Sequence, residues 1–303
     1  MTLFDAYLVA DWSASSTPKT GPDSVWFALG VRRDGRFAVE VLVNPPTRAR
    51  ATECVAARLA VLQAERLRVF VGFDFAYGYP AGLVEALTGE VHGAAWHTMW
   101  IQLAATIHDD PSNGNNRFKV ASELNAMVSA SPGPFWGCPP SKMTATLRST
   151  SCGFPYRVRD GVSLERLRIT EERLPRVQEA WKLSGAGSVG SQSLMGIPRV
   201  LSLRDDGRLA CTSSVWPFET GFTERPTSEA GPSILHAEIW PGIATVDVTL
   251  HAVKDAAQVL SLIRHLAELD EMGRLGRLFS RPNNLSNDQI RACLAEEGWI
   301  LGA

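Results

Sequence analysis

The chain has 303 residues, a length that allows one large domain or two ordinary ones. Its 30 basic and 32 acidic residues give a net charge of −2 at pH 7, which argues against a basic nucleic-acid-binding surface over the whole protein but not against a local one. Hydrophobic residues make up 45% and charged residues 20% of the chain, as in a globular protein. A chain of this length can bury roughly 75% of its unfolded surface.

Cysteine usage and hydropathy predict a cytoplasmic protein that does not associate with a membrane. The five cysteines are widely spaced and form no CxxC pair, which argues against a disulfide framework or a zinc site. The N-terminus lacks the pattern of a signal peptide, and no apolar run is long enough to span a bilayer.

The first predicted elements are three strands. Residues 5–12 are rich in β-formers and predict a strand buried on both faces. A polar loop with two prolines follows over 13–24. Residues 24–43 contain two apolar runs around Asp34 and Gly35, which predicts an antiparallel hairpin.

A helix and a further strand complete this unit. Residues 51–66 have apolar side chains at helical spacing, with Thr52 as a candidate N-cap. Residues 68–75 form a continuous apolar run, as expected for a strand covered on both faces. The intervening helix implies that this strand lies parallel to an earlier one. We therefore predict an α/β fold with a mixed sheet.

Residues 81–230 are predicted to form a large, mainly helical insertion rather than an independent domain. Asp206 and Gly207 suggest a turn inside a strand pair near 199–216. The predicted helices of this insertion cover residues 81–89, 93–108, 116–130 and 171–182.

The predicted core comprises residues 1–80 and 231–303. Residues 233–241 predict a strand and 255–273 the clearest helix, with one apolar face. The tail predicts a short strand or ordered coil that packs Trp299.

Four acidic residues lie at or near the ends of these core elements. Asp11, Asp74 and Glu238 end or lie in separate strands, and Asp255 opens the last helix. Carboxylates at the ends of neighbouring parallel strands share one sheet edge, where α/β proteins place their sites. Clustered carboxylates repel one another and favour a hard cation, so we predict Mg²⁺ or Mn²⁺ bound by these four acids.

A purely structural interpretation remains open for two of the acids. Asp255 also suits a helix N-terminus, and Asp74 also suits a turn cap. Glu238 and Asp11 are harder to explain in this way, because a carboxylate in an apolar strand must be paired or coordinated.

Several segments resemble a family of predicted ribonuclease H-like nucleases. They are "VADWSA", "VGFDFAYGYP", "NNRFKVASELN", "GSVGSQSLMGIP", "AEIWPG" and "EEGWI". The resemblance implies a ribonuclease H-like fold in which acids on the first strand, on the fourth strand and near the last helix bind two metal ions. By position these are Asp11, Asp74 and Asp255, with Glu238 on a later strand. The family's last helix often has a second acid one turn on, whereas Gln258 lies three residues after Asp255.

Six further residues are candidates for binding substrate phosphate. Backbone N–H groups of the Gly/Ser-rich segment 185–192 can hold an oxyanion, although a packed turn explains the glycines equally well. A solvated surface position is the alternative for the charged candidates. The candidates are Lys19, Arg117, Lys119, Lys182, Ser191 and Gln192.

The serine, cysteine and histidine residues give weaker indications of a catalytic site. No GxSxG or HExxH pattern is present, and Cys138 and Cys152 are expected to be inert thiols. His236 shares the strand face of Glu238, which suits a proton shuttle or, more simply, a core histidine.

The leading hypothesis is a metal-dependent hydrolase of a phosphoester, with a nucleotide or nucleic acid as substrate and Glu238 completing the metal shell or accepting a proton from water. The first alternative is a small-molecule enzyme with a capped pocket, enclosed by the aromatic residues Trp96, Trp100, Phe135 and Trp136. The second is a binding module without catalytic activity. A homo-oligomer is compatible with each.

Overall fold

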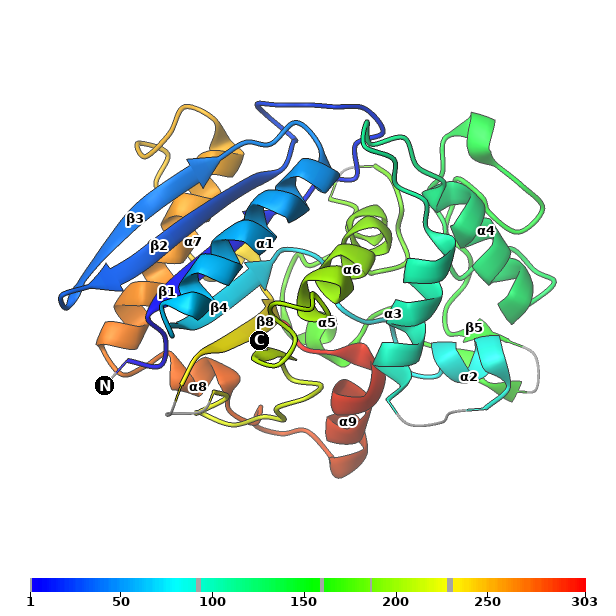
Figure 1. The fold of residues 1–303 in the computed structure, drawn as a ribbon. Coiled ribbons are helices and arrows are strands. Elements are labelled where there is room, and N and C mark those ends of the chain that lie inside the picture. Colours follow the sequence, from blue (N-terminus) through cyan, green and yellow to red (C-terminus); the bar gives the residue numbers. More distant parts are fainter. Residues whose placement is uncertain (1, 91–93, 159–160, 186, 228–230) are drawn as a thin grey trace.

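A six-stranded mixed sheet forms the centre of the molecule in the computed structural model, which describes residues 2–90, 94–158, 161–185, 187–227 and 231–303 (Figure 1). The strand order is β3-β2-β1-β4-β8-β7. β2 pairs antiparallel with both β1 and β3, whereas β1, β4, β8 and β7 run parallel. The strands are β1 (Ala6–Asp11), β2 (Trp26–Arg33), β3 (Arg36–Val43), β4 (Arg68–Phe73), β7 (Ser213–Val215) and β8 (Ser233–Glu238).

The predicted hairpin is confirmed. Asp34 and Gly35 connect β2 to β3 with φ angles of 50° and 75°. Both angles are positive, as the tight turn that matches strand twist requires, and Asp and Gly tolerate them.

Helix α1 (Arg48–Ala64) crosses from the hairpin to β4 and covers one face of the sheet, where Val55 and Leu59 are buried (Figure 1). It begins earlier than predicted. Thr47 is its N-cap and accepts a hydrogen bond from the N–H of Arg50, while the Thr52 hydroxyl donates to the carbonyl of Arg48 inside the helix.

Helix α7 (Lys254–Glu271) covers the opposite face, as Figure 1 shows. Its buried side chains Val259, Leu262, Ile263 and Leu266 pack with Tyr7, Val9 and Phe70 of the central strands. The predicted helix and its apolar face are therefore confirmed.

The helices between β4 and β7 gather at one end of the sheet (Figure 1). Helices α2 (Leu83–Thr88), α3 (Ala95–Thr106) and α4 (Arg117–Val128) occur where predicted. The helix expected over 171–182 is instead the short α5 (Ile169–Arg173) followed by irregular chain. Smaller elements are η1 (Pro140–Lys142) and the two-stranded sheet of β5 (Tyr156–Arg157) and β6 (Ser163–Leu164).

The predicted strand pair near 199–216 is wrong. Helix α6 (Gly190–Arg204) occupies the first part of this range, and only β7 follows, as an edge strand of the main sheet beside β8. The helix was not predicted because its first residues are rich in glycine and serine and because Pro198 lies inside it, and both features disfavour a helix. Tertiary packing compensates, because most side chains of α6 are buried, including Leu194, Ile197 and Val200.

The short helix η3 (Pro241–Ile243) connects β8 to α7. After α7 the chain returns to the sheet through α8 (Gly276–Phe279), α9 (Asn287–Ala292) and the short π-helix η4 (Cys293–Glu297). Trp299 is buried and Ile300 forms a bridge to Glu238, which confirms the predicted ordered tail.

All five cysteines are unpaired thiols, at positions 54, 138, 152, 211 and 293. No helix in the described ranges is both long and apolar enough to span a membrane.

Candidate active site

Asp11 and Asp74 lie together at the carboxyl end of the sheet. Asp11 is the last residue of β1 and Asp74 follows β4, and these strands are parallel neighbours with Ala10 opposite Phe73. The Asp74 Oδ1 atom accepts a hydrogen bond of 2.7 Å from the N–H of Trp12. The structure therefore brings these two predicted acids to one edge of the sheet.

Asp255, in the first turn of α7, approaches the same point from the other side of the sheet. Its Oδ2 atom accepts a hydrogen bond of 2.7 Å from the N–H of Asp23. Asp23 belongs to the loop after β1 and has a left-handed φ of 53°, a conformation that nothing in the local sequence predicts. Sequence reasoning missed this acid.

Burial and mutual repulsion both act on the pKa values of these acids. Burial raises the pKa of Asp11 well above its usual value, and the charges of Asp74, Asp255 and Asp23 raise it further. Lys254 offsets part of this effect. Burial also raises the pKa of Asp74 to about 7, against the lowering effect of the Trp12 hydrogen bond. At neutral pH the group favours the uptake of a proton or a cation.

Asp11, Asp74 and Asp255 supply the hard oxygen ligands that Mg²⁺ and Mn²⁺ prefer. In the part of the chain that the structure describes, no three His, Cys, Asp or Glu side chains form a preformed metal site. The fit to a cation therefore rests on ligand chemistry and on mutual repulsion of the three carboxylates.

Glu238 does not join this group. Its carboxylate is buried and receives two hydrogen bonds from Arg168, of 2.6 and 2.8 Å, and one of 2.9 Å from the N–H of Tyr77. These contacts occupy both oxygens, so we replace the predicted role in the metal shell with that of a buried ion pair.

Arg168 organises a network that the sequence analysis missed. Its guanidinium also contacts Glu171 and the carbonyl of Glu297. Burial raises the pKa of Glu171 to about 7, although Arg168 counteracts the shift. The only signal in the sequence is that Glu238 lies in an apolar strand and must have a partner. Its partner is 70 residues away.

Two candidates for phosphate binding lie at the start of α6, and one of them, Gln192, contacts the residue after Asp11. The Gln192 amide donates a 2.5 Å hydrogen bond to the carbonyl of Trp12, the residue after Asp11. The buried Ser191 hydroxyl donates to the carbonyl of Leu183 and accepts from Nε of Arg117.

Arg117 is a largely desolvated cation. Its guanidinium donates to the hydroxyls of Ser16 and Ser191 and to the side chain of Asn115. Within the described ranges no carboxylate forms an ion pair with it. Burial, assisted by the charge of Arg48, lowers the pKa of Arg117 to about 10. A desolvated cation of this kind favours an anionic neighbour.

The three lysine candidates are less well placed. Lys19 is exposed and pairs with Asp23 at 3.3 Å, so it borders the acids only indirectly. Lys119 is exposed on α4 and pairs with Glu123. The Lys182 Nζ atom lies 5.8 Å from the centre of the Trp136 ring. The ion pair of Lys119 with Glu123 does not connect it to the acids.

A cavity of about 400 Å³ is lined in part by Asp74. Its buried lining residues include the ion-paired Arg168, Glu171 and Glu238. The residues nearer to solvent are Arg176, Val177, Gln178, Ser188, Val189, Gln192, Trp240 and Pro241.

The aromatic residues that were predicted to enclose a ligand belong mainly to the core. Trp96 stacks on Phe218, Trp100 packs against Tyr77, and Phe135 packs against Tyr79 and Trp181. Trp136 is partly buried, and its Nε1 atom donates to Glu179.

His236 and the loop cysteines are inert in this structure. Burial lowers the pKa of His236 to about 3, which favours a neutral core histidine over a proton shuttle. Burial raises the pKa of the Cys138 thiol and raises that of Cys152 to about 11, so neither is a thiolate at neutral pH.

Comparisons of the chain with protein-family models, with curated proteins and with solved structures find no match.

Proposed function

We propose that this protein is a metal-dependent hydrolase of phosphoesters, with a ribonuclease H-like core. The observation that carries the proposal is the convergence of Asp11, Asp74 and Asp255. Burial raises the pKa of Asp11, and the charges of Asp74 and Asp255 raise it further. Carboxylates in such an arrangement are typical ligands of Mg²⁺ or Mn²⁺ in enzymes that act on phosphates.

The order of elements supports this core. A first strand that ends in an acid, an antiparallel hairpin, a crossover helix and a parallel strand that precedes a second acid follow one another in the chain. This is the arrangement that the resemblance to ribonuclease H-like nucleases implies, and the final helix adds the third acid at Asp255.

Each residue has a distinct role in the proposal. Asp11, Asp74 and Asp255 would hold the cation, which when bound activates water and neutralises charge on the phosphate. The N–H of Trp12 orients Asp74, and Gln192 holds the carbonyl of Trp12. Glu238 is left out of the cation site, because Arg168 neutralises it. Arg117, which bonds to Ser191, would attract the phosphate-bearing part of the substrate.

A compact substrate is favoured over a long duplex. Long duplexes are normally bound by many Lys and Arg contacts, whereas this chain has a net charge of −2. The cavity beside Asp74 favours the related possibility of a small phosphorylated metabolite. Unpaired thiols at all five cysteines are in keeping with action in the cytoplasm.

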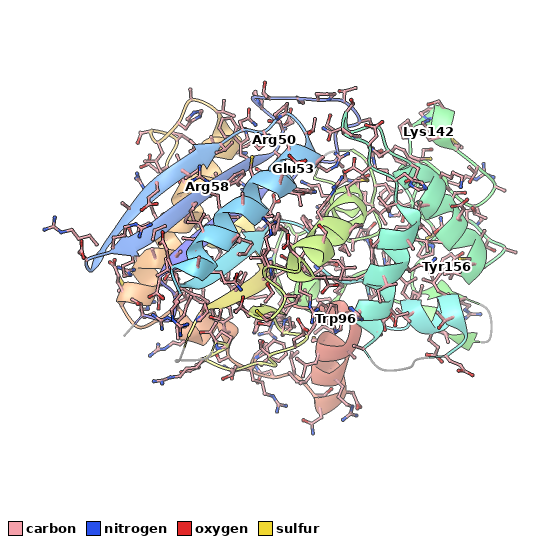
Figure 2. The ribbon with its side chains drawn as sticks, in the orientation of Figure 1. Arg50, Glu53, Arg58, Trp96, Lys142 and Tyr156 are labelled. Atoms are coloured by element: carbon pink, nitrogen blue, oxygen red, sulfur yellow. The ribbon has the colours of Figure 1, made fainter. Side chains whose placement is uncertain are left out.

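The test is hydrolysis of a panel of phosphomonoesters, phosphodiesters, nucleotides and single-stranded oligonucleotides with Mg²⁺ or Mn²⁺. We expect Asp11→Asn and Asp255→Asn each to lower kcat by about 100-fold or more, since each removes a charged ligand. The matched control is Glu53→Gln, on the solvent side of α1 (Figure 2), which should retain full turnover. Unchanged turnover of Asp11→Asn would refute the assignment.

A further inference from the structure

Trp240 differs from the other eight tryptophans of the chain. Each of those eight contacts another aromatic ring or a cation in the described structure. Trp240 has no such partner among the described residues, is only half-buried and lines the cavity beside Asp74.

The backbone supports Trp240 closely. A Cβ atom at Gly242 would lie 2.4 Å from the indole ring, so only glycine allows the ring to rest against this turn. The cavity therefore has an aromatic wall that rests against a backbone turn and that no side chain of the described residues stacks on.

Polar groups complement this wall. The amide of Gln178 makes no side-chain hydrogen bond within the described ranges, and an amide offers both a donor and an acceptor. Arg176 is exposed, has a left-handed φ of 75° and forms no ion pair in the described part of the chain. The cavity thus combines an aromatic face, a neutral hydrogen-bonding group, a free cation and, at Asp74, the proposed cation site.

We propose that this cavity binds a single nucleotide, with its base stacked on Trp240, the base edge at the Gln178 amide, and its phosphate between Arg176 and the acids. The proposal rests on the proposed function for its orientation, because the phosphate must reach the acids to react. A volume of about 400 Å³ falls in the range of ligand pockets, which is about 300–1,000 Å³.

The geometry also restricts the source of the nucleotide. A base inside a duplex is stacked and cannot enter a cavity without being flipped out. A free mononucleotide and the end of a single strand both present an unstacked base. Because every base has a stacking face, binding should depend only weakly on base identity.

The test is calorimetric titration of the full chain, in the presence of Mg²⁺, with adenosine monophosphate, inorganic phosphate and a short single-stranded oligonucleotide. We expect Trp240→Leu to weaken nucleotide binding about 10-fold, and Trp240→Phe to keep it within about 3-fold, because Phe still stacks. Arg176→Gln should weaken binding about 5-fold, whereas its matched control Arg58→Gln on α1 (Figure 2) should not.

The outcomes separate this proposal from the proposed function. Binding of adenosine monophosphate that depends on Trp240 supports the nucleotide cavity even where no hydrolysis occurs. Equal binding by wild type and Trp240→Leu, or inorganic phosphate binding as tightly as the nucleotide, overturns it even where Mg²⁺-dependent hydrolysis is observed. Preference for the monophosphate over the oligonucleotide identifies a free nucleotide as the source, and the reverse identifies a strand end. Unfolding curves by circular dichroism check that each variant is folded.

Discussion

Two groups of carboxylates differ in how their charge is balanced, and Asp74, Glu171 and Glu238 of these groups line one cavity. Glu238 and Glu171 share one cation, Arg168, which bonds to both, and burial raises the pKa of Glu171 to about 7. Asp11, Asp74 and Asp255 face one another, with Lys254 only partly offsetting the charge at Asp11. The first group contains its own cation and connects segments far apart in the chain, whereas the second, in our proposal, takes up an external cation. A buried carboxylate alone does not indicate a site; an unbalanced one does.

The largest expected effect on stability comes from removing Arg168, the cation that pairs with Glu171 and Glu238. Arg168→Met leaves two buried carboxylates without their partner, so we expect a loss of about 3–5 kcal/mol in the free energy of unfolding, measured by urea denaturation. Adding Glu238→Gln to this variant should restore part of the loss. The control Arg58→Met removes an exposed arginine on α1 (Figure 2) and should cost less than about 0.5 kcal/mol. A small loss in Arg168→Met would contradict the assignment of a structural network.

His236 extends the comparison to a buried base. Its pKa is lowered to about 3 by burial, so on acidification the unfolded chain binds a proton that the folded chain refuses. This contribution to stability is complete above about pH 6.5 and is lost as the pH falls toward 3, at up to about 1.4 kcal/mol per unit. The free energy of unfolding of the wild type should fall between pH 6.5 and 4. We expect His236→Leu to make this fall smaller by about 2 kcal/mol, measured by urea denaturation across that range. The control His108→Gln changes an exposed histidine and should leave the dependence of the free energy of unfolding on pH unchanged. The same unchanged dependence in His236→Leu would show that His236 takes up a proton in the folded state.

A divalent cation should stabilise the folded protein by binding to Asp11, Asp74 and Asp255, and not to Glu171 and Glu238. Mg²⁺ at ten times its dissociation constant stabilises the folded state by about 1.4 kcal/mol, a rise of about 3 °C in Tm. We expect this rise in the wild type and in Arg117→Lys, and its absence in Asp74→Asn. A rise of equal size in Asp74→Asn would place the cation elsewhere.

Without a cation, removing one acid should stabilise the chain. Asp74→Asn keeps an oxygen that can accept the hydrogen bond from Trp12 but removes a charge that is repelled by its neighbours. Because the side chain is partly solvated, we expect a gain of only about 1 kcal/mol at pH 8 without Mg²⁺, measured by thermal unfolding. Glu53→Gln is the control, and destabilisation by Asp74→Asn would show that the charge is already balanced.

Much of the core could be predicted from local pattern. Asp34 and Gly35 predict a tight turn between two strands, and the hairpin is present. The apolar residues of 255–273 recur at helical spacing, and this segment forms α7 with a buried apolar face. Helix α6 could not be predicted, because its glycine-rich start and Pro198 disfavour a helix that only burial against the rest of the molecule stabilises.

The same division holds for the candidate site. The apolar runs in the chain were enough to predict that Asp11 and Asp74 lie at the ends of strands and that Asp255 opens a core helix, and parallel pairing of β1 with β4 brings the first two acids to one sheet edge. The ion pair of Glu238 with Arg168, the approach of Asp23 to the acids and the position of Trp240 at a cavity emerge from the folded chain alone. The physical reason is that charge balance depends on partners far away in the chain, such as Arg168, whose positions no local pattern encodes.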